Sequence, residues 1–154
     1  MPIRDANLRS VERLRTVAVG PPELGIYDFR ISIYDIDGFT ILEDELGFHW
    51  EECYEHGGNI VKMSKVSKDG ESFYGLGDKP THLNLKGKRV ENWATDQYAF
   101  HKDQEPLYKV VPFYIGLHHN KAYGIFFDNT FRTYFDFCHE RRNVTSFWAE
   151  GGEM

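Results

Sequence analysis

The residues that could break or form bonds lack the spacing that such chemistry needs. General acid–base catalysis requires two groups in a fixed geometry around one bond, but Asp128, Asp136 and Glu150 are separated by whole candidate strands. His118 and His119 are adjacent at a predicted hairpin tip, where neighbouring side chains ligate a metal poorly. We expect both histidines to be solvated, and we predict no catalytic residue and no metal site in these 154 residues.

Other reactive motifs are also missing from the sequence. No Ser/His/Asp or Cys/His arrangement suggests an activated nucleophile. Gly75 and Gly77 do not precede a predicted helix, so they do not form a phosphate-binding loop. Cys53 and Cys138 lack metal-ligand spacing, and two cysteines do not make a disulfide framework. We therefore expect two reduced, partly buried thiols, a reducing compartment and no bound cofactor.

One long segment in the middle of the chain differs from the rest. Residues 75–108 contain glycines, prolines and many polar residues with little periodicity, which predicts a long ordered loop. Within it, Asp96 lies among the aromatic residues Trp93, Tyr98 and Phe100. On local chemistry alone, an aspartate in a loop is best explained by hydrogen bonds from its own backbone. We expect the three aromatic rings to form a small cluster that pins the loop, rather than a surface for stacking ligands.

Short β-strands are predicted on both sides of this loop. Ile31 and Ile33 alternate with polar residues, which is the two-residue period of a strand with one buried face. The acidic run 43–45 is expected to be a solvated edge or turn, whereas 35–38 and 118–121 are expected to be hairpin turns. Strands are predicted at 29–34, 39–42, 48–53, 60–66, 110–117, 122–127, 131–137 and 144–148.

Composition supports an all-β domain. The chain contains 12 Phe, 9 Tyr and 3 Trp together with 14 Gly. Aromatic side chains suit half-buried pleated surfaces, and glycine suits the turns between short strands. The regular spacing of short strands predicts a β-sandwich or barrel, and residues 29–154 are predicted to be one domain. Residues 1–28 are predicted to be a tail or a short helix.

Charge and hydropathy narrow the range of partners. The formal net charge is −6, which argues against a nucleic-acid partner because such binding needs a basic face. The first ten residues are polar and contain no apolar signal segment, and no apolar run is long enough to span a membrane. We therefore expect no nucleic-acid partner, no membrane partner and a cytoplasmic location.

A series of segments resembles the signature of glycoside hydrolase family 31, which includes α-glucosidases and α-xylosidases. The resemblance extends from about Phe29 to the C-terminus, and the order and spacing of the segments make the combination specific. Asp78 replaces a glutamate of the family pattern, and Thr95-Asp96 matches its Thr-Asp pair. The matching segments are Tyr-Gly-Leu-Gly-Asp-Lys at 74–79, the stretch 83–89, Asn-Trp-Ala-Thr-Asp-Gln-Tyr-Ala-Phe at 92–100, and the stretches 106–113, 123–130 and 149–152.

The resemblance implies a galactose-mutarotase-like β-sandwich, or supersandwich, that is incomplete in this chain and carries one long ordered loop. In the family, a catalytic (β/α)8 barrel of about 250 residues follows this domain. The nucleophile and the acid/base of a retaining mechanism are therefore expected outside this chain, which alone should be inactive. For Asp96 the resemblance implies binding of sugar hydroxyls through charge-assisted hydrogen bonds. The implied partners are an α-glucoside or oligosaccharide and the barrel of the same polypeptide.

Other functions stay open at this point. An independent carbohydrate-binding module would need an exposed aromatic platform, and a sugar epimerase would need a His and Glu pair, for which no motif surrounds the seven histidines. The choice among α-glucosidase, α-xylosidase and transglycosylase depends largely on barrel loops. If strands that the family sandwich usually has before residue 29 and after 152 are absent, self-association through exposed sheet edges is expected.

Overall fold

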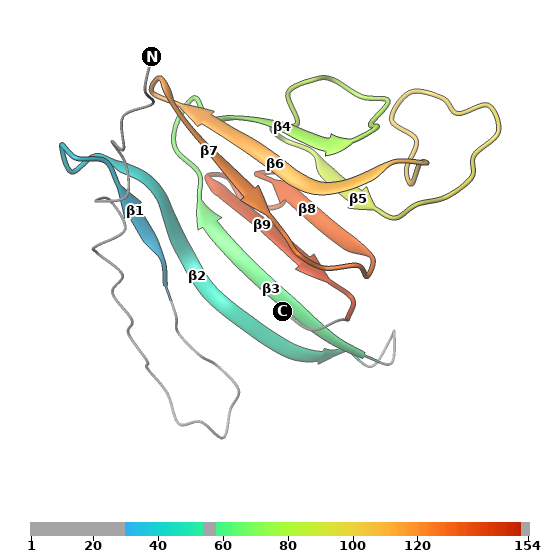
Figure 1. The fold of residues 1–154 in the computed structure, drawn as a ribbon, viewed down its shortest axis with the longest axis horizontal. Helices are drawn as coiled ribbons and strands as arrows, with labels where there is room; N and C mark the ends of the chain where they lie inside the picture. Colours follow the sequence, from blue (N-terminus) through green and yellow to red (C-terminus); the bar gives the residue numbers. More distant parts are fainter. Residues whose placement is uncertain (1–29, 54–57, 152–154) are drawn as a thin grey trace, which may run out of the picture.

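The computed structural model describes residues 30–53 and 58–151, and all regular structure in these two ranges is β-strand (Figure 1). They hold no helix that could serve as a membrane span. The predicted tail or short helix at 1–28 lies outside the described residues. The strands are β1 (Ser32–Tyr34), β2 (Thr40–Cys53), β3 (Gly58–Val66), β4 (Ser72–Gly77), β5 (Arg89–Asn92), β6 (Val110–His118), β7 (Lys121–Phe126), β8 (Thr133–Phe137) and β9 (Val144–Ala149).

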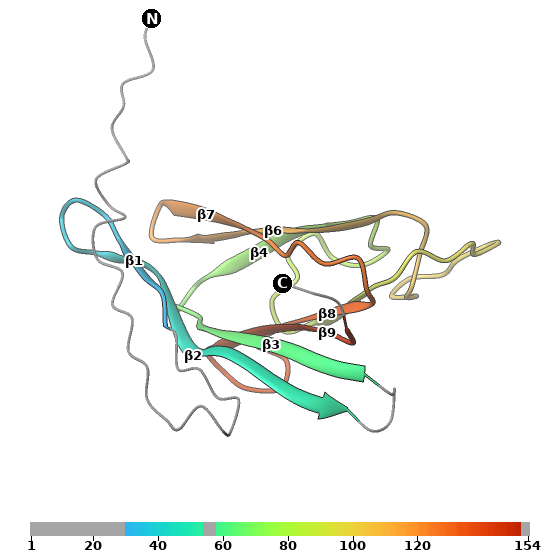
Figure 2. The same ribbon diagram turned by 60° about the horizontal axis from the view of Figure 1, so that its bottom comes forward.

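Two antiparallel sheets face each other, as Figure 2 shows, so the all-β sandwich predicted from the sequence is confirmed. The larger sheet has the order β1-β2-β3-β9-β8-β5, and the smaller has the order β4-β6-β7. The outermost strands are β1 and β5 in the larger sheet and β4 and β7 in the smaller. Self-association through these edges stays a prediction.

The two predicted hairpin turns have the backbone conformations that their residues favour. Between β1 and β2, Gly38 adopts a φ of +83°, and its N–H donates to the carbonyl of Asp35 at 3.0 Å. Between β6 and β7, His119 and Asn120 both have positive φ, at 48° and 56°. Two positive-φ residues form the type I′ turn that matches the twist of paired strands.

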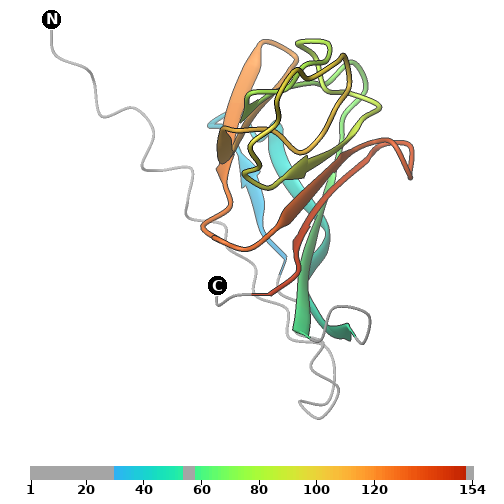
Figure 3. The same cartoon turned by 90° about the vertical axis from the view of Figure 1, so that its right-hand side faces the viewer.

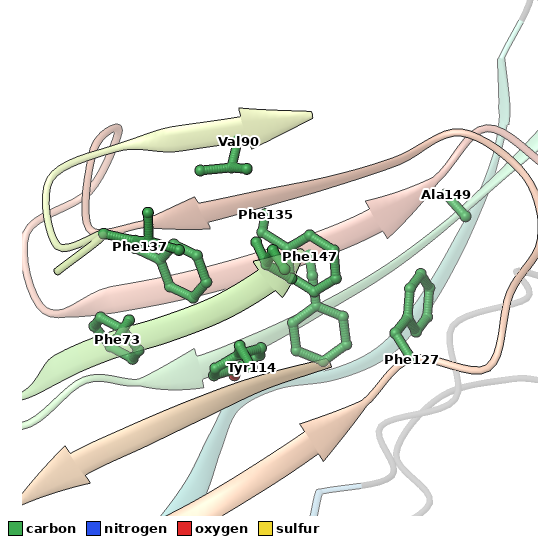
Figure 4. Close-up of a cluster of buried hydrophobic side chains, with 10 residues drawn as sticks. Phe73, Val90, Tyr114, Phe127, Phe135, Phe137, Phe147 and Ala149 are labelled. Carbon is green, nitrogen blue, oxygen red and sulfur yellow. The ribbon is translucent and has the colours of Figure 1, made fainter. Parts of the chain in front are cut away.

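Aromatic rings fill the space between the sheets (Figure 4). Tyr114 of β6 is fully buried, and its ring meets Phe137 edge-on with ring centroids 5.1 Å apart. It also makes edge contacts with Phe135 and Phe147 of the larger sheet. Burying one such side chain contributes about 1.5–3 kcal/mol, and an aromatic pair in this geometry adds about 0.5–1.5 kcal/mol. Six aromatic residues of the described ranges are buried in this core, but eight others are exposed, so the core accounts for only part of the aromatic-rich composition.

The acidic run 43–45 is not a solvated turn, and for Asp44 that prediction is wrong. Strand β2 continues through the run, and its register places Asp44 opposite Lys65 of β3. Both residues are buried, at 4% and 3% exposed, and their side chains form an ion pair. Asp44 Oδ2 also accepts a hydrogen bond from the backbone N–H of Ile31 at 2.8 Å. A carboxylate can be buried here because a cation and a backbone donor both compensate it.

The prediction for His118 is also wrong. The residue is 3% exposed, and its Nε2 lies 2.8 Å from the carbonyl oxygen of Ile41 in β2. His119, by contrast, is exposed as expected. Lys121 forms an ion pair of 2.7 Å with Asp35, so the β6–β7 hairpin tip is docked onto the β1–β2 hairpin. This contact between distant parts of the chain removes His118 from water.

We predict that Lys65→Met lowers the free energy of unfolding by about 3–5 kcal/mol, because it leaves the buried Asp44 carboxylate without its cation. Urea denaturation of the 154-residue chain measures the effect. The double variant Lys65→Met/Asp44→Asn should recover part of the loss, since its amide oxygen can still accept from Ile31. A wild-type midpoint for Lys65→Met would show that the pair is unimportant for stability.

Candidate functional site

Asp96 lies on the segment 93–109, which joins β5 to β6 and extends beyond one end of the sandwich (Figure 1). Figure 3 views the molecule from this end. The Asp96 side chain is exposed, and no residue of the described ranges makes a hydrogen bond or ion pair with its carboxylate. The interpretation of Asp96 as an aspartate that caps its own loop backbone is therefore not supported. Its carboxylate oxygens are available to a ligand.

The aromatic residues around Asp96 do not form the predicted cluster. Tyr98 is 99% exposed, and Trp93 and Phe100 are 41% and 52% exposed. No ring contact joins any two of these three residues, all of which lie in the described part of the chain. Trp93 instead lies under the guanidinium of Arg132, with 5.2 Å from the carbon of that group to the ring centroid. Other interactions must therefore hold the loop.

A partly buried ion pair holds the base of the loop, where Lys79, Glu91 and Glu105 meet; we call this region the neck. Lys79 lies just after β4, and its Nζ is 3.4 Å from Oε1 of Glu105. The same ammonium group donates a hydrogen bond to the backbone carbonyl of Glu91 in β5. The other carboxylate oxygen of Glu105 accepts from the backbone N–H of Glu91 at 2.6 Å. The pair thus occupies both backbone groups of Glu91 and ties the two ends of the loop together.

Burial makes the members of this pair dependent on each other. The side chain of Lys79 is 6% exposed, and burial lowers the pKa of its ammonium group, an effect that the Glu105 carboxylate opposes. Burial likewise raises the pKa of Glu105, while the N–H of Glu91 and the charge of Lys79 oppose that shift. Removing either member would leave the other charge poorly compensated in the neck.

Further contacts order the outer part of the loop, as the sequence predicted for this segment. Asp103 accepts hydrogen bonds from the hydroxyl of Thr81 at 2.5 Å and from Lys88 Nζ at 3.1 Å. These two interactions lower the pKa of the Asp103 carboxyl. Within the loop, Gln104 Nε2 donates to Gln97 Oε1 at 3.0 Å. Asp96 is therefore presented by an ordered support.

Two glycines allow β4 to approach β6 closely at the neck. Gly75 and Gly77 have φ values of +126° and +81°. A Cβ at Gly75 would lie 2.6 Å from the carbonyl oxygen of Phe113, and one at Gly77 would lie 2.5 Å from that of Lys109. Any side chain at either position would push β6 away from β4. These glycines serve the backbone rather than a phosphate, as the sequence indicated.

An open groove lies beside the base of the loop. It has a volume of about 370 Å³ and lies between the start of β6, the end of β7 and the segment that follows β7. Its walls are mainly apolar, and the Asp128 carboxylate contributes polar character. Most of its apolar lining comes from Trp93, Val110, Pro112, Phe126 and Phe131.

The remaining polar candidates do not gather into a second site. Asp136 is buried, where it forms an ion pair with Arg89 at 3.2 Å, so its role is structural. In residues 30–53 and 58–151 no group of three or more His, Cys, Asp or Glu side chains is placed to hold a metal ion. Cys138 is a free, partly buried thiol as predicted, whereas the side chain of Cys53 lies outside the described ones.

Comparison with known proteins gives the family of this sandwich. A model of the glycosyl hydrolase 31 N-terminal galactose mutarotase-like domain matches residues 13–136. The chain belongs to glycosyl hydrolase family 31. The sequence resemblance and the galactose-mutarotase-like sandwich are therefore confirmed. The match begins upstream of the motifs that carry the resemblance.

Several family 31 relatives resemble this chain. Alpha-glucosidase 2 from Bacillus thermoamyloliquefaciens is 35% identical over 128 residues, which cover 82% of this chain and 16% of that protein. Isomaltosyltransferase from Sporosarcina globispora is 26% identical over 133 residues, which cover 80% of this chain and 11% of that protein. The chain thus spans about a sixth or less of the length of these relatives.

A solved family 31 structure shares the fold. A variant of the family 31 dextranase from Flavobacterium johnsoniae, in complex with isomaltotriose, has a TM-score of 0.72 and 34% sequence identity to this chain. The match covers 82% of this chain and 15% of the dextranase. The sandwich described above is therefore a small part of a much longer enzyme in this relative.

Sequence reasoning missed the Lys79–Glu105 ion pair and the strands β4 and β5, which take up part of the predicted loop 75–108. Strand β5 has four residues and depends on pairing with β8, more than forty positions later. Lys79 and Glu105 lie in or beside two of the family segments, but their separation in the sequence hides their contact. These features are tertiary, and the local sequence pattern gave no direct signal for them.

We predict that Glu105→Ala loosens the loop and lowers the free energy of unfolding by about 2 kcal/mol, since it leaves Lys79 and the N–H of Glu91 without their partner. Urea denaturation and trypsin cleavage after the exposed Lys102 measure the two effects. Glu140→Ala is the matched control, because it removes a carboxylate whose ion pair with Arg89 is exposed and lies outside the loop. Equal cleavage rates in wild type and Glu105→Ala would contradict this role.

Proposed function

We propose that this chain is the accessory N-terminal domain of an α-glucosidase-type glycoside hydrolase, and that its loop 93–109 supplies Asp96 to the substrate pocket of a catalytic barrel. The observation that carries the proposal is the exposed Asp96 carboxylate, which has no partner in the described residues although the loop around it is ordered. The relatives named alpha-glucosidase 2 and dextranase support an α-linked glucoside or oligosaccharide as the substrate.

An aspartate on an ordered loop suits the recognition of sugar hydroxyls. An ionised carboxylate can accept two strong hydrogen bonds, and vicinal hydroxyls of a glucose ring offer two donors side by side. Because the neck pair of Lys79 and Glu105 already orders the loop, little conformational entropy is lost when a sugar binds. The proposed contribution of Asp96 is therefore substrate binding and orientation.

Bond cleavage is assigned to another part of the parent enzyme. A retaining glycosidase needs two carboxyl groups about 5–5.5 Å apart, one as nucleophile and one as acid/base. In this proposal the barrel supplies both, and the sandwich packs on the barrel and brings its loop to the pocket. The bond-breaking carboxylates and Asp96 thus come from different domains of one polypeptide.

We predict that Asp96→Ala in the full-length enzyme lowers kcat/KM for an α-glucoside by about 10²–10⁴-fold, which corresponds to the loss of two hydrogen bonds to a charged group. Steady-state kinetics with maltose or isomaltose measure the change. Asp69→Ala removes another exposed aspartate, in the turn between β3 and β4, and should leave the kinetics unchanged. Wild-type kinetics for Asp96→Ala would refute the role of this residue.

We also predict that the purified 154-residue chain does not hydrolyse p-nitrophenyl α-glucoside, because in this proposal both catalytic carboxyl groups belong to the barrel. Release of p-nitrophenol is followed by absorbance, with the full-length enzyme as the positive control. Turnover that copurifies with the chain through several columns would contradict the assignment of catalysis to the barrel.

A further inference from the structure

The two sheets of the sandwich present very different outer faces. In β6, Tyr114, Gly116 and His118 point into the molecule and are buried. The residues between them point outward, are all apolar and are 37–42% exposed. These outward residues are Val111, Phe113, Ile115 and Leu117.

The strand register extends this apolar surface across the whole smaller sheet. Phe113 lies opposite Phe126, which is 62% exposed, and Ile115 lies opposite Gly124. The ring of Phe113 covers Gly124 so closely that a Cβ there would lie 2.7 Å from it. On the other side of β6, the register pairs Ile115 with Tyr74 of β4. No charged residue occupies the outward positions of β4, β6 and β7. We call these outward positions the apolar face. They are Ser72, Tyr74, Val111, Phe113, Ile115, Leu117, Ala122, Gly124 and Phe126.

The larger sheet provides the contrast. Its outward positions carry mainly charged and polar side chains, and three of them, Ser64, Asp136 and Ser146, are buried among their neighbours. Trp148, the large aromatic residue on that side, lies beneath the cationic groups of Lys62 and Arg89, each 5.3 Å from its ring centroid. The outward positions of the two central cross-strand rows are Lys62, Trp148, Tyr134 and Glu91, and then Ser64, Ser146, Asp136 and Arg89.

An uncharged sheet face of this extent marks an interaction surface. Soluble proteins seldom expose contiguous apolar patches of several hundred Å² unless a partner covers them. The apolar face is continuous with the groove at the base of the loop, because Phe126 belongs to both. Trp93, at the start of the loop that carries Asp96, forms another wall of that groove. The face, the groove and the loop base therefore form one connected surface.

We propose that the apolar face and the adjoining groove are the seat of the catalytic domain of the same polypeptide, an inference that rests on the proposed function. The chain spans 16% of alpha-glucosidase 2, so in a parent of that size most of the polypeptide is available to cover this surface. A domain seated in the groove lies beside the origin of the loop that would carry Asp96 to its pocket. The partner surface over the apolar face must itself be uncharged and apolar, since the face offers no ion-pair partner, whereas Asp128 in the groove can accept a cationic group.

A second copy of the chain fits this surface less well. Each copy carries a formal net charge of −6, so association of two copies brings like charges together. Two copies seated face to face would also cover the groove beside the loop base and obstruct the path between the loop and a substrate pocket. A domain of the same polypeptide avoids both problems.

Carbene footprinting of the 154-residue chain and of the full-length enzyme tests this assignment. Ile115, Leu117 and Phe126 should be labelled in the isolated chain and lose their labelling in the full-length enzyme. Tyr134 and Trp148, on the larger sheet, serve as the control and should be labelled in both. Equal labelling of the apolar face in the two proteins would overturn the proposal, and so would protection that disappears when the full-length enzyme is diluted, because that result identifies a second copy.

A substitution gives an independent measurement. Ile115→Lys should leave the melting temperature of the isolated chain unchanged, because residue 115 is already 42% exposed there, and should lower that of the full-length enzyme. Ile36→Lys, at a 92% exposed position in the turn between β1 and β2, is the control in both proteins. If Ile115→Lys has no effect on the full-length enzyme, the proposal fails. Protection of the apolar face together with wild-type kinetics for Asp96→Ala would refute only the role of Asp96.

Discussion

The packing of Tyr114 against the phenylalanines of the larger sheet is the interaction on which the rest of the structure depends. Tyr114 lies at the centre of β6 and contacts Phe135, Phe137 and Phe147 across the sandwich. Because a strand alternates its side chains, fixing Tyr114 inward also fixes Phe113 and Ile115 outward. One contact in the core thereby determines both the closure of the sandwich and the composition of its outer face.

Charged groups are buried where the strands alone would not fix the geometry. The ion pair of Asp44 and Lys65 joins β2 to β3, and Asp44 also accepts a hydrogen bond from Ile31 just before β1. The ion pair of Lys79 and Glu105 joins the two ends of the long loop. Such pairs add little net stability compared with apolar packing, but they permit one arrangement and penalise others, since a displaced charge would lose its partner. At the neck, this constraint gives Asp96 a defined position although its own carboxylate has no partner in the described residues.

The proposed function divides the work of a glycosidase between two domains. The sandwich would contribute a carboxylate that orients the sugar, and the barrel would contribute the carboxyl groups that break the glycosidic bond. In this scheme the ordered loop and the apolar face both serve to fix the position of Asp96. The apolar face fixes the sandwich on the barrel, and the neck pair fixes the loop on the sandwich, so that Asp96 has a reproducible place relative to the reacting bond.

The sequence by itself determined most of the strands, the two hairpin turns and the family. Alternation at Ile31 and Ile33 and the turn residues at 35–38 act over a few positions, so they can be recognised without knowledge of the fold. The ordered family segments likewise identified the sandwich and singled out Asp96.

Only the tertiary structure decided which polar groups are buried and which apolar groups are exposed. Asp44 and His118 look solvated in sequence, but Lys65 lies 21 positions away from the first, and Ile41 lies 77 positions away from the second. Strand β5 and the neck pair likewise need partners from distant segments. The outward apolar side of β6 resembles an ordinary buried strand in sequence, because the number of layers that cover a strand is a property of the whole assembly.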